Sequence, residues 1–139
     1  MLADNSCIAL QALSLPALPR AAAAQKSTTF ETSFTDRYVV VNGLRLHYLE
    51  SGPPTKPTMI LMHGIARHAH TFDHIAPELT RDYHVVALDM RGHGDSAWSP
   101  EGAYLVEDHV KDLEAVIREL GLRRVTLWGN STGGRVVQV

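Results

Sequence analysis

The chain has 139 residues, of which 45% are hydrophobic and 20% are charged, and its formal net charge is −2. This composition is typical of a globular protein with one core, and neither sign of charge dominates as it does on nucleic-acid-binding surfaces. The single cysteine, Cys7, excludes an intramolecular disulfide and a cysteine-based metal site. No apolar run approaches the roughly 20 residues that cross a bilayer, so we expect neither a nucleic acid nor a membrane as partner.

Residues 1–36 are interpreted as an N-terminal tail, followed by a domain over 37–139. The apolar stretch 8–18 and the small alanines at 22–24 are typical of a secretory signal and its cleavage site. However, no Lys or Arg precedes the apolar stretch, and Asp4 carries the opposite charge. A disordered tail and an over-long start-codon assignment are the alternatives. We therefore favour a cytoplasmic location, with a secreted or periplasmic one if the tail is a signal peptide.

The first regular element is a β-hairpin over residues 38–49. Asn42-Gly43 separates two apolar runs and supplies the positive φ angles of a type I′ turn. After the turn, apolar and polar residues alternate over 44–48, as in a strand with one buried face.

Three later runs, 58–62, 83–88 and 125–128, are apolar without polar alternation and predict strands buried on both faces. The segments between them have apolar residues three or four apart, which predicts helices over 72–79 and 106–120. Strands that alternate with helices predict an α/β fold. We expect a mostly parallel sheet with an N-terminal antiparallel hairpin and helices on both faces.

Ligands of such sheets bind at the carboxyl ends of the strands. Three short segments follow these ends: His63-Gly64, Arg91 to Ser96 within the sequence DMRGHGDS, and residues 129–133. We therefore expect the three segments to meet at one edge of the sheet.

Residues 129–133 read G-N-S-T-G, the G-x-S-x-G pattern that presents a nucleophilic serine on a strained turn between a strand and a helix. Side chains at Gly129 and Gly133 would collide where the helix folds back beside the strand, and Ser131 must adopt unfavourable backbone angles. The alternative is a glycine-rich turn with an incidental serine.

Two other glycine-rich sites are excluded by the same residues. A phosphate-binding loop needs a lysine where Arg135 stands and a hydroxyl where Val136 stands. A dinucleotide fingerprint needs its second glycine where Ser131 stands.

A serine nucleophile also needs a base and donors for the developing oxyanion. Gly64 permits a close approach of its loop to the nucleophile, so the backbone N–H groups of Ile65 and Thr132 are candidates for an oxyanion hole. We interpret His63 as a structural residue that hydrogen-bonds this loop, and not as the general base.

His68, His70 and His74 lie close together in the sequence, and the last two are four residues apart. Zinc hydrolases with two such histidines place a glutamate beside the first, where this chain has Thr71. We therefore expect solvated or loop-packing histidines, and neither a metal nor a cofactor.

Three motifs resemble the α/β-hydrolase superfamily in their order and spacing, namely HG, DMRGHGDS and GNSTGG. The resemblance extends over residues 38–139. The resemblance implies a hydrolase of a small-molecule ester, lactone or carbon–carbon bond. In it Ser131 is the nucleophile, and Ile65 and Thr132 supply the oxyanion-hole N–H groups. It also implies that Arg91 to Ser96 form a structural turn, in which glycines and Asp95 set up the edge of the active site. Asn130 before the serine is similar to hydrolases that cleave carbon–carbon bonds of aromatic ring-fission products.

In that family the triad follows the chain order Ser, then Asp or Glu, then His. Residues 132–139 contain neither an acid nor a histidine. We therefore expect the N-terminal portion of a hydrolase, inactive by itself, with the domain cut after the nucleophile turn and its last strand, 125–128, at an edge of the sheet. The alternative is a non-catalytic chain that keeps the scaffold as a binding or regulatory module.

Overall fold

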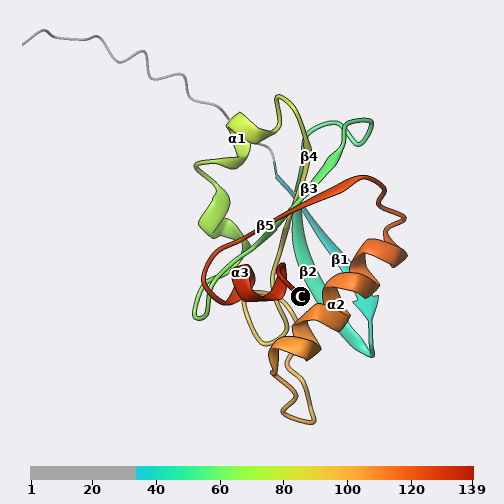
Figure 1. The fold of residues 1–139 in the computed structure, drawn as a ribbon, viewed down its shortest axis with the longest axis vertical. Coiled ribbons are helices and arrows are strands. Elements are labelled where there is room, and N and C mark those ends of the chain that lie inside the picture. Colours follow the sequence, from blue (N-terminus) through green and yellow to red (C-terminus); the bar gives the residue numbers. More distant parts are fainter. Residues whose placement is uncertain (1–33) are drawn as a thin grey trace, which may run out of the picture.

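The computed structural model describes residues 34–139, which form one five-stranded mixed sheet with helices on both faces (Figure 1). The strands are β1 (Thr35–Val41), β2 (Leu44–Ser51), β3 (Thr58–Met62), β4 (His84–Leu88) and β5 (Val125–Gly129). The helical elements are η1 (Ala69–Phe72), α1 (Ala76–Leu79), α2 (Val106–Glu119) and α3 (Thr132–Val136). The signal-like segment lies outside the described residues, and β1 begins at Thr35, inside the range assigned to the tail.

The strand order is β1-β2-β4-β3-β5. β1 pairs with β2, and β2 with β4, in antiparallel fashion, whereas β3 pairs in parallel with β4 and with β5. The predicted α/β fold, with a parallel sheet joined to an antiparallel hairpin, is therefore confirmed. The parallel strands bring the segments after β3, β4 and β5 to the same edge of the sheet.

The hairpin turn has the predicted geometry. Asn42 has φ of 50° and Gly43 has φ of 77°, and Val41 is paired directly with Leu44 across the turn. Positive φ at both central residues is the condition for a type I′ turn, whose twist matches that of the strands.

The inner strands pack on both faces, which explains why they lack polar alternation. Ile60 and Val86 belong to the cluster that α2 and α3 cover, whereas Leu61 and Val85 belong to the cluster that η1 and α1 cover. All four side chains are fully buried. In Figure 1, α2 and α3 lie toward the lower part of the view and α1 toward the upper left.

The predicted helix over 72–79 is wrong in extent. The segment forms two short pieces, η1 and α1, with Pro77 in the first turn of α1. A proline has no N–H, and inside a continuous helix its ring clashes with the preceding turn, so it is tolerated only at a helix start. The apolar positions nevertheless reach the core, because Phe72 and Ala76 are both buried.

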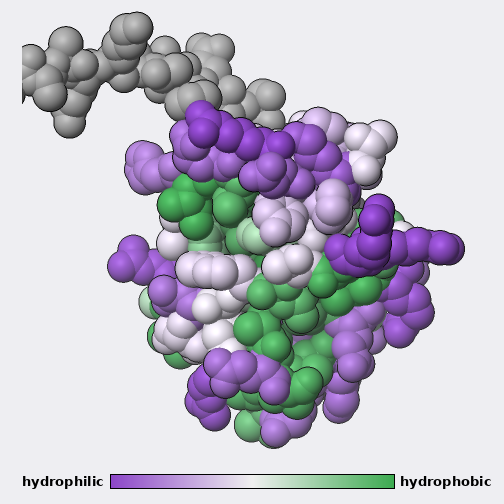
Figure 2. All heavy atoms as spheres, turned by 45° about the horizontal axis from the view of Figure 1, so that its top comes forward, coloured by the Kyte–Doolittle hydropathy of each residue, from purple (hydrophilic) through white to green (hydrophobic). Residues whose placement is uncertain are grey.

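The prediction that 125–128 is buried on both faces is wrong, whereas its expected position at a sheet edge is confirmed for the described residues. β5 is an edge strand in the described part of the chain, and Leu127 and Trp128 are 37% and 42% exposed. Trp128 is partly covered by Phe72, whose ring meets it edge to face at 5.6 Å between centroids. Hydrophobic side chains reach the molecular surface in the space-filling view as well (Figure 2).

Candidate active site

Ser131 lies at the apex of a sharp turn between β5, which ends at Gly129, and α3, which begins at Thr132. Its backbone angles are φ 53° and ψ −115°, outside the regions that residues with a side chain ordinarily occupy. Such a conformation costs of order 1–3 kcal/mol and persists only where the surrounding structure enforces it. The side chain is exposed, and Ser131 Oγ has no hydrogen-bond partner among the described residues.

Contacts with the end of β3 enforce this turn. The Asn130 N–H donates to the Met62 carbonyl, and the Gly133 N–H donates to the His63 carbonyl, each at 3.0 Å. A Cβ added at Gly133 would lie 2.3 Å from the Met62 carbonyl oxygen. One added at Gly129 would lie 2.3 Å from the Gly133 oxygen. The sequence-based reason for the two glycines is therefore confirmed.

The loop after β3 approaches the turn closely. A Cβ added at Gly64 would lie 3.1 Å from the Cβ of Ser131 and 3.4 Å from Oδ1 of Asn130. Ile65 follows, with its side chain 71% exposed, and Thr132 begins α3. The fold thus brings together, at the carboxyl ends of β3 and β5, the two segments that carry Ile65 and the adjacent residues Ser131 and Thr132.

His63 is fully buried and connects this loop to the end of β4. Its Nε2 accepts the Met90 N–H at 3.1 Å, so the ring proton is on Nδ1, which donates to the Gly64 carbonyl at 2.8 Å. The Gly64 carbonyl and the Ile65 N–H belong to one planar trans peptide and point in opposite directions. By holding the carbonyl, His63 therefore directs the Ile65 N–H away from its own ring.

The pKa of His63 is lowered, mainly because burial penalises the charged imidazolium. The neutral ring can accept the Met90 N–H, whereas a protonated ring cannot. Both observations agree with the structural role expected for His63.

Asp89, at the end of β4, organises the DMRGHGDS segment. One of its carboxylate oxygens accepts the Ala69 N–H at 2.5 Å. The other accepts the Asp95 N–H at 3.0 Å and contacts His47 Nδ1 at 2.8 Å. Gly94 must be a glycine, because its Cβ would lie 2.0 Å from the Asp89 carboxylate.

Sequence reasoning did not identify Asp89 or His47. It assigned the structural role to Asp95, which joins this network through its backbone N–H. In the sequence, the two residues stand out only as a histidine within a strand and an aspartate directly after a buried strand. Local spacing does not reveal that the two side chains meet.

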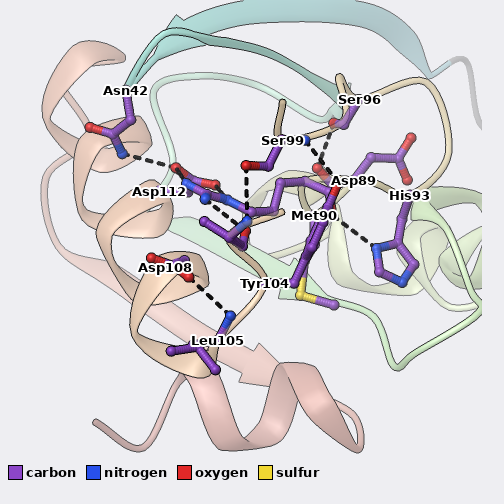
Figure 3. Close-up of polar contacts among 12 residues, drawn as sticks. Asn42, Asp89, Met90, His93, Ser96, Ser99, Tyr104, Leu105, Asp108 and Asp112 are labelled. Carbon is purple, nitrogen blue, oxygen red and sulfur yellow. Dashed lines mark hydrogen bonds and ion pairs between the residues drawn. The ribbon is translucent and has the colours of Figure 1, made fainter. Parts of the chain in front are cut away.

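Arg91 connects the same segment to α2 and, through Asp112, to the hairpin turn, where Figure 3 shows Asn42 pointing toward Asp112. Its guanidinium binds both carboxylate oxygens of Asp112, at 2.6 and 2.7 Å, and donates to the Ala103 carbonyl at 3.0 Å. Asn42 donates to the same Asp112 carboxylate at 2.9 Å. The hydrogen bond from Arg91 to Asp112 raises the pKa of Arg91. The predicted structural role of this segment thus rests on the buried side chains of Asp89 and Arg91.

The histidines after β3 lie on the surface side of the molecule. His70 Nδ1 contacts the Asp73 carboxylate at 3.1 Å, and the rings of His68 and His70 meet edge to face. The described residues contain no group of three histidine, cysteine, aspartate or glutamate side chains that could hold a metal ion. None of the helices in residues 34–139 is long and apolar enough to span a membrane.

Comparison with known proteins gives one consistent family. A family model described as alpha/beta hydrolase fold matches residues 57–139. The chain is similar to epoxide hydrolase A of Mycobacterium tuberculosis, with 38% identity over 106 residues that cover 74% of this chain and 33% of that protein. It is also similar to a 3-hydroxybutyrate-oligomer hydrolase of Cupriavidus necator, with 35% identity over 66% of this chain and 32% of that protein.

A solved structure described as a membrane phospholipase A and bacterial virulence factor superposes with a TM-score of 0.72. The two sequences are 36% identical, and the match covers 74% of this chain and 33% of the other. The chain therefore spans about a third of the length of these relatives.

Proposed function

Because this chain belongs to the alpha/beta hydrolase fold family, we propose that it carries the nucleophile and the oxyanion hole of a serine hydrolase. Ser131 is the nucleophile, and the backbone N–H groups of Ile65 and Thr132 receive the oxyanion. The single observation that supports this most is the positive φ of Ser131, held in a turn that tolerates only glycine at positions 129 and 133. Strain of this kind is found where a residue must be presented in one orientation for chemistry.

In the proposed reaction, Ser131 Oγ attacks the carbonyl carbon of the substrate while a base removes its proton. The negative charge that develops on the carbonyl oxygen accepts hydrogen bonds from the two backbone N–H groups. Collapse expels the leaving group and leaves an acyl-serine, which water then hydrolyses. The proposal requires a general base that the described residues do not place beside Ser131.

A serine nucleophile favours carbonyl substrates over epoxides. Addition of Ser131 to an ester or lactone gives an acyl-enzyme, which retains a carbonyl for water to attack. Addition to an epoxide carbon would instead leave a serine ether, which has no such carbonyl. We therefore propose ester or lactone hydrolysis. This reaction is closer to the one that the name 3-hydroxybutyrate-oligomer hydrolase describes than to epoxide hydrolysis, although the chain is also similar to epoxide hydrolase A. Asn130 is the feature that supports carbon–carbon bond hydrolysis as a variant of the same mechanism.

The second candidate is a non-catalytic binding module on the same scaffold. It is supported by one observation, which is that Ser131 Oγ has no hydrogen-bond partner in the described part of the chain. A module of this kind would bind a small molecule at the strand edge without activating the serine.

A fluorophosphonate probe separates the two candidates. The protein is treated with the probe in the absence and presence of added imidazole, which supplies a base in solution, and the modified residue is located by peptide mass spectrometry. We expect Ser131 to be modified, faster with imidazole, and Ser131→Ala to abolish labelling. Ser99→Ala is the matched control and should label like the wild type.

Labelling that survives Ser131→Ala would contradict the assignment of the nucleophile. Absence of labelling with imidazole present, in protein shown to be folded by circular dichroism, would favour the binding module.

A further inference from the structure

A cavity lies at the end of the sheet opposite Ser131. It has a volume of about 440 Å³, within the range of small-molecule sites. It is lined by Tyr48 of β2, Thr58 of β3, His84 of β4 and the loop after α2. Thr58 is the first residue of β3 and Met62 the last, so the length of the strand, about 13 Å at the usual rise, separates the cavity from the candidate active site.

The Tyr48 hydroxyl is a donor without a partner in this cavity. The residue is 7% exposed, yet its hydroxyl makes no hydrogen bond with any described residue. The hydroxyl oxygen itself is not fully buried, so it is open to a ligand in the cavity. Burial raises the pKa of Tyr48, with the Glu50 carboxylate as the second cause. The hydroxyl therefore stays protonated and available to donate near neutral pH.

Positive charge exceeds negative charge around the cavity. Arg123 and Arg124 line it, are exposed, and have no ion pair or side-chain hydrogen bond in the described part of the chain. Lys56 also lines it and donates to two neutral backbone carbonyls, which leave its charge uncompensated. The one lining carboxylate, Glu50, already contacts His84 at 2.9 Å and Arg37 at 3.1 Å.

These observations determine the chemistry of a complementary ligand. The unpartnered groups are donors, so the ligand must bring acceptors, and the excess of cations favours acceptors that carry negative charge. Guanidinium groups match the geometry of carboxylate and phosphate oxygens. Val86, Leu120 and Leu122 form the apolar part of the wall. We propose that this cavity is a binding site for a small organic anion, a carboxylate or phosphate on a compact apolar body, separate from the candidate active site.

The site is tested by titrating the isotopically labelled protein with benzoate, phenyl phosphate and inorganic phosphate at constant ionic strength, and following backbone amide shifts. We expect saturable shifts at Tyr48, His84 and residues 120–124 with both organic anions. Inorganic phosphate should bind more weakly, because it has no apolar body. A preference for benzoate or for phenyl phosphate identifies which oxyanion the cavity takes.

Three variants assign the binding to named groups. Tyr48→Phe keeps the packing of the ring and should weaken binding by at least about tenfold, since hydrogen bonds to charged acceptors are stronger than those between neutral groups. The double variant Arg123→Gln with Arg124→Gln should abolish saturable binding. Arg118→Gln removes an exposed charge from α2 outside the cavity and should leave binding unchanged.

Ser131→Ala should also leave binding unchanged, which keeps this test independent of the proposed hydrolase activity. The proposal is overturned if no probe gives saturable shifts. It is equally overturned if Arg118→Gln weakens binding as much as the double variant, because that would indicate nonspecific attraction to surface charge.

Discussion

His109, on α2, is a buried histidine to which the proposed chemistry gives no role. It is 5% exposed, and its Nδ1 has no hydrogen-bond partner among the described residues. Its pKa is lowered, first by burial and then by the positive charge of Arg91, while Asp112 acts in the opposite direction. The ring therefore remains neutral in the folded protein under conditions where an exposed histidine is protonated.

This difference makes stability depend on pH in a defined direction. As the pH falls through about 6.5, the usual histidine pKa, the unfolded chain binds a proton that native His109 does not. Stability is therefore lost on acidification, and the loss is complete below the lowered pKa of the native state. His63, whose pKa is also lowered by burial, contributes in the same direction.

We predict that His109→Leu raises the free energy of unfolding by about 1 kcal/mol at pH 7.5, because it removes an unsatisfied buried nitrogen. The gain should be larger at pH 5.5, where the variant also removes the cost of keeping the imidazole neutral. Urea unfolding at the two pH values measures both effects. His74→Gln, at an exposed histidine, is the control and should leave the pH dependence unchanged. A gain that is the same at both pH values would contradict the explanation.

At the scale of elements, a buried ion pair holds the segment after β4 against α2. The side chains of Arg91 and Asp112 are 7% and 4% exposed, and two hydrogen bonds join them. Removing one partner of such a pair leaves a buried charge uncompensated. The ion pairs on the surface, such as Arg81 with Glu78, are screened by water and contribute little.

Asp112→Ala should accordingly lower the free energy of unfolding by about 3–5 kcal/mol, as found when buried ion pairs are broken. Glu78→Ala should change it by less than about 1 kcal/mol. Chemical denaturation of both variants tests the contrast. Equal effects of the two substitutions would show that the buried pair does not hold this segment in place.

The elements also differ in how far their sequences predicted them. The hairpin and α2 were predicted correctly, because Asn42-Gly43 and a regular apolar spacing act locally. The helix over 72–79 was wrong because Pro77 restarts the helix and outweighs the periodicity around it. The burial predicted for β5 on both faces was wrong, because an apolar run does not tell how much of a strand its neighbours cover.

At the scale of the whole molecule, the proposed nucleophile and its oxyanion donors lie at the carboxyl ends of the parallel strands. Among the described residues, no histidine is hydrogen-bonded to Ser131. Without a base to accept its proton, the hydroxyl stays a neutral alcohol and a poor nucleophile. A serine protease that has lost a triad member retains only about 10³–10⁴-fold catalysis over the uncatalysed reaction.

The 139-residue chain by itself should therefore hydrolyse p-nitrophenyl acetate no faster than its Ser131→Ala variant. Release of p-nitrophenol, measured at matched concentrations of the two proteins, provides the comparison. Robust turnover that depends on Ser131 would show instead that a base is recruited from within the chain or from a second copy of it.

The sequence by itself determined the features that depend on neighbours along the chain. These are the type I′ turn, the three apolar strands, and the need for glycine at positions 129 and 133 around Ser131. Only the tertiary structure decided which polar groups meet. Asp89 contacts His47, 42 residues away, and Asp112 contacts Asn42, 70 residues away. Periodicity reports which face of an element is apolar, whereas these pairs depend on strand order and on how helices cross the sheet, which no local pattern encodes.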